Sequence, residues 1–162
     1  MDSVTLWVDA LLTAALAGWI GIGALENIRE PRLNADMVAD VIAMGKMRRE
    51  YPDQFALVGG NRIDDPRFHR LAFVLIVIAE SVATLLLIAG ALGLAGAALG
   101  LCGAGAARLA AIFGTVGFTM IWSAFLVGGQ WFHYWLAEQD AQHTHFLLAL
   151  WGLATLMILM RV

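Results

Sequence analysis

The sequence contains few of the residues that cross-link or solubilise a small globular protein. Its one cysteine, Cys102, excludes an intrachain disulfide and leaves the redox compartment open. Charged residues make up 14% of the chain, against about 25% in soluble proteins. The only three prolines, Pro31, Pro52 and Pro66, all fall in one polar stretch. Scarce charge and clustered prolines predict long uninterrupted helices with one polar connection.

Recognisable catalytic signatures are also missing. The sequence has no Walker loop, dinucleotide fingerprint, zinc-protease motif or nucleophile elbow. The formal net charge of −3 provides no basic excess for nucleic acid. These absences do not favour an enzyme, and they exclude nucleic acid as an expected partner.

Hydrophobic residues, by contrast, are abundant, at 60% of the chain with a mean hydropathy of +0.76. A soluble protein this apolar would lack the polar groups to cover its surface, so we expect a lipid bilayer as its solvent. Four apolar stretches reach the roughly 20 residues needed to cross a bilayer, or fall just short of it. They span about residues 6–25, 67–92, 108–128 and 145–161. We predict a single all-α domain, a bundle of four transmembrane helices.

The polar connection, residues 26–66, contains a further predicted helix at about 35–49. Asn34 is a candidate N-cap, apolar residues recur on one face, and Tyr51-Pro52 ends the pattern. One interpretation is a short amphipathic helix at the membrane surface or over the bundle. The other is a docking element for a partner. Asp65-Pro66 then predicts the start of the second span.

The distribution of basic residues predicts the orientation. Eight of the ten Lys and Arg residues lie between residues 26 and 70. Because Lys and Arg in short loops favour the cytoplasmic side, we expect cytoplasmic long loops and extracytoplasmic termini in a bacterial inner membrane.

Two acids, Asp9 and Glu80, lie inside predicted spans, where ionisable groups are expensive and commonly functional. Arg108 and Arg161 belong to the same side of the membrane, so structural ion pairs across helices are one interpretation. A protonated Glu80 bonded in the core is another, and proton transfer or ligand binding by Glu80 is a third. His69 lies 11 residues before Glu80 and therefore shares its helix face.

Histidines and aromatic residues gather toward the opposite side. Four histidines would in principle hold a metal or haem, but their spacing matches no ligand motif. The run around Trp131, Phe132 and Trp135 is typical of an interfacial aromatic belt. The alternative is a flat pocket for a quinone, a lipid or another ring, with Gln142 and His145 as polar contacts.

The chain resembles the bacterial family of predicted small integral membrane proteins termed domain of unknown function 2165. The resemblance covers essentially the whole chain. It rests on Asn27 at the end of the first span, His69 and Glu80, Gly128-Gly129-x-Trp131-Phe132, Trp135, Gln142 and Phe146. Gln130 stands where the family pattern has Glu, and His133 and His143 lie outside that pattern. The resemblance implies a topology and no established activity or cofactor.

Three functions are consistent with these features. The favoured one is an accessory or assembly subunit of a larger membrane complex, because the chain is small and lacks catalytic motifs. The second is a redox or cofactor-binding protein, with a quinone, haem or metal held by Glu80, His69, Trp131 and His145. A proton-linked small transporter using Glu80 is the third.

Overall fold

The computed structural model describes residues 2–161, and within that range the chain is helical and contains no strand. Four helices are long and apolar enough to cross a membrane, which confirms the all-α, four-span prediction. Their lengths follow from lipid, in which a backbone must satisfy its own hydrogen bonds. The elements are α1 (Ser3–Arg29), α2 (Arg32–Ile42), α3 (Gly45–Glu50), α4 (Pro52–Val58), the 3₁₀ turn η1 (Gly59–Asn61), α5 (Pro66–Ala98), α6 (Ala104–Trp131), α7 (Tyr134–Ala137) and α8 (Gln139–Leu159).

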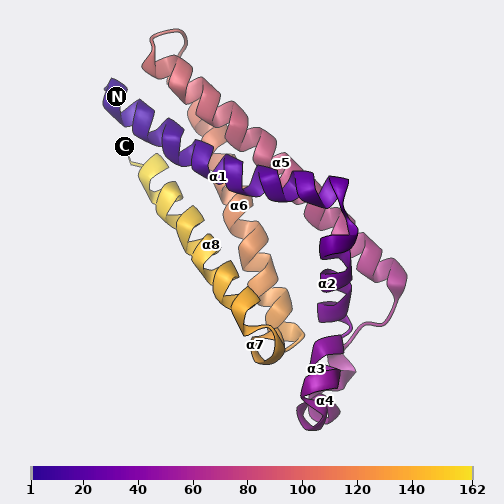
Figure 1. Ribbon diagram of the computed structural model, residues 1–162. Coiled ribbons are helices and arrows are strands. Elements are labelled where there is room, and N and C mark those ends of the chain that lie inside the picture. Colours follow the sequence, from indigo (N-terminus) through magenta and orange to yellow (C-terminus); the bar gives the residue numbers. More distant parts are fainter. Residues whose placement is uncertain (1, 162) are drawn as a thin grey trace.

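The four long helices pack in sequence, α1 on α5, α5 on α6 and α6 on α8. Both chain ends and the α5–α6 turn lie at one end of the bundle, which we call the terminal end (Figure 1). Helices α2 to α4 and α7 lie at the other, which we call the loop end (Figure 1). The connections of the two ends therefore differ greatly in length, and the larger polar segment covers only one of them.

Small residues bring α5 and α6 into close contact. A Cβ on Gly90 would lie 2.6 Å from the backbone nitrogen of Ala111, and one on Gly114 would lie 2.8 Å from Leu87. In lipid no hydrophobic effect drives helices together, so close backbone approach through glycine is an effective source of packing energy. Phe118 fills the centre of the resulting core and is fully buried.

The helices extend beyond the apolar stretches that identify them in the sequence. Helix α5 has 33 residues, which corresponds to about 50 Å at a rise of 1.5 Å per residue. The Asp65 carboxylate accepts a hydrogen bond from the Arg67 amide at 2.9 Å and Pro66 occupies the first turn, as the sequence predicted. Helix α8 likewise begins at Gln139, six residues before the predicted span. Hydropathy marks the lipid-facing portion of a helix, whereas hydrogen bonding continues into the polar region.

The single helix predicted at 35–49 is wrong, because the structure contains α2 and α3 separated by Met44, whose φ is 52°. The Asp40 carboxylate stabilises this left-handed turn by accepting from the Lys46 amide at 2.9 Å and from Arg49 at 3.0 Å. Asn34 is not an N-cap either. Pro31 precedes the helix, and Asn34 lies in its first turn with its side chain directed to another helix.

Candidate functional site: a cavity at the loop end

A cavity of about 380 Å³ lies at the loop end, where residues of α1, α2, α5, α6, α7 and α8 line it. The volume falls within the range of about 300–1,000 Å³ that is usual for small-molecule sites. Most of its lining is aliphatic or aromatic, and its few polar side chains belong to two groups that define two walls.

The first polar wall is a chain of three side chains from three helices. Asn34 of α2 donates to the Asn27 Oδ1 at 2.6 Å, and the Asn27 Nδ2 donates to the Glu80 Oε2 at 2.8 Å. Both Asn27 and Glu80 are only 6% exposed. The second carboxyl oxygen, Glu80 Oε1, has no hydrogen-bond partner among residues 2–161. One acceptor of a buried acid therefore remains available at the cavity.

The second wall is aromatic. The Tyr134 hydroxyl of α7 lies 3.1 Å from the His145 Nδ1 of α8, and the His145 ring stacks on Trp122 with centroids 5.5 Å apart. Phe125 packs on the other side of His145, at 5.0 Å between centroids. Burial raises the pKa of the Tyr134 hydroxyl, so this hydroxyl stays protonated and can donate to the imidazole. The buried Trp122 Nε1 has no hydrogen-bond partner in the described part of the chain.

A close packing contact seats the aromatic wall. A Cβ on Gly129 of α6 would overlap the ring of Tyr134, whereas one on the adjacent Gly128 would meet nothing within 4 Å. Gly129 is therefore the residue that lets the Tyr134 ring lie against α6 and reach His145.

Charge is distributed unevenly around the cavity. Glu80 is the one acid in the lining, and neither lysine nor arginine contributes to it within residues 2–161. An unpaired carboxyl in such surroundings can accept a hydrogen bond, balance a cation, or donate a proton once protonated.

An ion pair joins the segments that cover the loop end. Lys46 of α3 lies 3.1 Å from Glu138, the residue before α8, and this hydrogen bond raises the pKa of Lys46. The contact ties the α2–α3 segment to the α7–α8 connection beside the cavity.

The structure brings together four of the residues that the sequence singled out. Asn27, Glu80, Phe132 and His145 all line the cavity. Phe73, seven residues before Glu80 on α5, lines it as well.

The remaining candidates lie elsewhere. His69 Nε2 is 2.7 Å from the Ile63 carbonyl near the start of α5. Trp131 is 60% exposed and donates to the Asn61 carbonyl at 3.3 Å. Trp135 packs against His133, at 6.4 Å between ring centroids. Gln142 is half-buried on α8 and does not line the cavity.

Sequence reasoning missed four cavity residues, Asn34, Trp122, Phe125 and Tyr134. Asn34 carried a misleading signal, because asparagine before an amphipathic pattern is typical of an N-cap. Trp122 and Phe125 carried a sequence signal that could have identified them. Their spacing of three, followed four residues later by Gly129, places all three on one face of α6.

Metal ligands do not cluster in the structure. Within residues 2–161, no group of three or more His, Cys, Asp and Glu side chains is arranged to hold a metal ion. His143 is exposed and His133 lies 3.1 Å from the Trp131 carbonyl, away from His145. The described geometry therefore offers no support for a four-histidine site.

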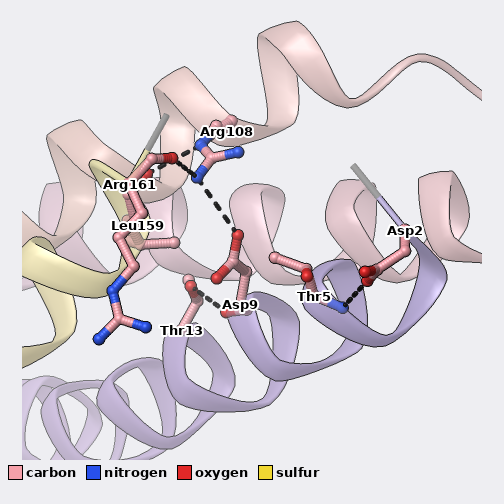
Figure 2. Close-up of polar contacts among 7 residues, drawn as sticks. All are labelled: Asp2, Thr5, Asp9, Thr13, Arg108, Leu159 and Arg161. Carbon is pink, nitrogen blue, oxygen red and sulfur yellow. Dashed lines mark hydrogen bonds and ion pairs between the residues drawn. The ribbon is translucent and has the colours of Figure 1, made fainter.

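A second polar cluster lies at the terminal end (Figure 2), and none of the residues drawn there lines the cavity. Arg108 of α6 donates to the carbonyls of Leu159 and Arg161 at 2.8 and 3.0 Å, which satisfies free carbonyls at the end of α8. Its Nη2 lies 3.6 Å from the Asp9 Oδ2, and Asp9 is 1% exposed. That separation exceeds a hydrogen bond, so neither Asp9 carboxylate oxygen has a hydrogen-bond partner within residues 2–161.

This cluster places Arg108 beside Asp9, whereas Glu80 meets an asparagine instead of an arginine. In Figure 2 the Arg161 guanidinium lies apart from the Asp9 carboxylate, and its backbone carbonyl meets Arg108. The arrangement links α1, α6 and α8 and has the character of a structural tie.

Comparison with known proteins identifies a family. A family model described as "Predicted small integral membrane protein (DUF2165)" matches residues 5–161. No curated protein and no solved structure matches the chain.

Proposed function

The chain belongs to the DUF2165 family of small integral membrane proteins, and from that premise we propose that it binds a small lipid-soluble molecule in the loop-end cavity. The observation that carries the proposal is a largely apolar cavity of about 380 Å³ lined by Glu80, whose Oε1 accepts no hydrogen bond within residues 2–161. A ligand that donates to this oxygen would gain a hydrogen bond, and the apolar lining would hold the rest of the molecule.

We place the entry route between α1 and α8. These helices touch through Trp19 and Trp151, whose ring centroids are 6.2 Å apart. Beyond this contact they diverge toward the loop end (Figure 1). Gly23 of α1 and Ala141 of α8 line the cavity where the two helices have separated. A molecule dissolved in the bilayer would reach the cavity there without crossing the polar α2–α4 segment.

Cavity filling tests the proposal. Gly23 lines the cavity and a Cβ on it meets nothing within 4 Å, so Gly23→Leu adds side-chain volume at the cavity wall from an unobstructed Cβ. Gly18 of the same helix is exposed, is equally unobstructed and lies outside the cavity, so Gly18→Leu is the matched control.

The probe is a neutral, photoreactive aryl diazirine added to the full chain in lipid nanodiscs, with labelled peptides identified by mass spectrometry. We expect saturable labelling of peptides containing residues 72–80 and 122–134 in the parent protein and in Gly18→Leu, and its loss in Gly23→Leu. Labelling that rises linearly with probe in all three proteins would refute a binding cavity.

For location, we propose a bacterial inner membrane with the loop end in the cytoplasm. The support is charge, since eight of the ten basic residues lie between residues 26 and 70 and such loops favour the cytoplasmic side. The accessory-subunit role favoured by the sequence is a separate prediction that ligand binding does not exclude. Stable co-purification with a larger membrane protein in mild detergent would support it.

A further inference from the structure

We propose that the ligand of this cavity is a lipophilic organic cation, an amine or onium group carrying aromatic or alkyl substituents, held with its charge beside Glu80. The inference rests on the proposed function and names the chemical class that the cavity would accept.

Charge is the first argument. Glu80 is 6% exposed, and its one hydrogen bond comes from the neutral amide of Asn27. No lysine or arginine in the described cavity lining balances an ionised carboxylate. By contrast, the other buried acid in a span, Asp9, has Arg108 at 3.6 Å. A carboxylate isolated from water is costly unless a cation accompanies it. The missing cation at Glu80 is the part that a ligand would supply.

The composition of the walls is the second argument. Five aromatic rings, from α5, α6, α7 and the residue after α6, line the cavity that contains Glu80, and they are Phe73, Trp122, Phe125, Phe132 and Tyr134. The face of an aromatic ring attracts cations, and the attraction strengthens where water is excluded. A buried carboxyl within aromatic walls therefore suits a bulky, weakly hydrated cation.

Hydrogen-bonding capacity is the third argument. A neutral ligand rich in carbonyl groups, such as a quinone, needs several donors, whereas the Asn27 and Asn34 amides each already use one of their two N–H groups within the protein. The Trp122 indole nitrogen has no partner within residues 2–161, but it is buried, so its donor is not open to a ligand in the cavity.

A matched pair of probes separates charge from size. Methyltriphenylphosphonium is a lipophilic cation, and triphenylphosphine oxide is a neutral compound of similar shape with one acceptor oxygen. Binding of each is measured by equilibrium dialysis against the full chain in nanodiscs of zwitterionic lipid, with empty nanodiscs subtracted. We expect saturable binding of the cation at least tenfold tighter than that of the neutral compound.

The isosteric variant Glu80→Gln removes the charge and keeps an acceptor for Asn27. It should weaken cation binding at least tenfold and leave the neutral compound unaffected. Asp36→Asn, an exposed acid of α2 outside the cavity, is the control and should change neither affinity. The comparison of the two probes on the parent protein stands even where a variant folds poorly.

Equal saturable binding of both probes, insensitive to Glu80→Gln, would overturn the cationic class and leave the binding cavity in place. If neither probe binds saturably and diazirine labelling is also unsaturable, both the cationic class and the proposed function fail.

Discussion

Replacing Gly129 with alanine tests how the aromatic wall of the cavity is built. The new methyl group would occupy space that the Tyr134 ring fills, and the ring would have to move away from α6. Tyr134 is 4% exposed and lines the cavity, so its ring can relieve the clash only by shifting against its packed neighbours or into the cavity. The displacement should also break the 3.1 Å contact between its hydroxyl and His145.

The magnitude follows from three contributions. Overpacking a filled site costs about 1–3 kcal/mol, and losing one hydrogen bond costs about 0.5–1.5 kcal/mol. Alanine stabilises a helix by about 0.5–1 kcal/mol relative to glycine, which offsets part of this loss. We therefore expect Gly129→Ala to lower the free energy of unfolding by roughly 0.5–4 kcal/mol. Gly128→Ala gains the same helix propensity without a clash, so it should be neutral or stabilising by up to about 1 kcal/mol.

We would measure the free energy of unfolding of both variants as full chains in dodecylmaltoside micelles. Sodium dodecyl sulfate is added in increasing mole fraction, and far-ultraviolet circular dichroism reports the loss of helix. The adjacent glycines share one helix and one environment of detergent, so their difference isolates the Tyr134 contact. Equal stability of Gly129→Ala and Gly128→Ala would refute the reasoning.

Two further predictions concern orientation and the α2–α3 turn. Cys102, the single cysteine, is exposed in the turn at the terminal end, so a membrane-impermeant maleimide should label it in right-side-out vesicles. Labelling only after permeabilisation would show the opposite orientation to the one proposed. The variant Cys102→Ser, which has no cysteine, is the negative control. The hydrogen bond from Arg49 holds the pKa of Asp40 below its ordinary value of 3.8. The contribution of the ionised Asp40 to folding stability is therefore fully present above pH 3.8, and it is lost as the pH falls through the lower pKa of the folded protein. Asp40→Asn should therefore destabilise the protein by about 0.2–1 kcal/mol at pH 7, and the difference should shrink below about pH 4 in the same micelle assay.

Much of the fold could be predicted from the sequence because lipid imposes a simple rule. A stretch of about 20 apolar residues must cross as a helix, since nothing else satisfies the backbone in hydrocarbon. Local chemistry also fixed the start of α5, where Asp65 caps the helix and Pro66 occupies its first turn. These features depend on neighbouring residues alone.

The break between α2 and α3 lay beyond sequence reasoning. The apolar pattern of the segment runs through Met44, and methionine rarely adopts a left-handed conformation. Its φ of 52° is supported by Asp40, which bonds Lys46 and Arg49 after the turn. Periodicity reports which residues are apolar, and it does not report a side chain that folds back to cap the next helix.

The candidate site likewise combines features that the sequence predicts with features that only helix packing decides. Sequence alone placed Glu80 inside a span and on one helix face with His69, and it placed aromatic residues toward the loop end. Only the tertiary structure decided that Asn27, 53 residues away, bonds Glu80, and that Tyr134 instead of Trp131 faces inward. Those pairings depend on the rotation and axial offset of one helix against another. Hydropathy does not determine the rotation or the offset of a helix, because lipid accepts any apolar face. Close contacts at residues such as Gly129 determine them.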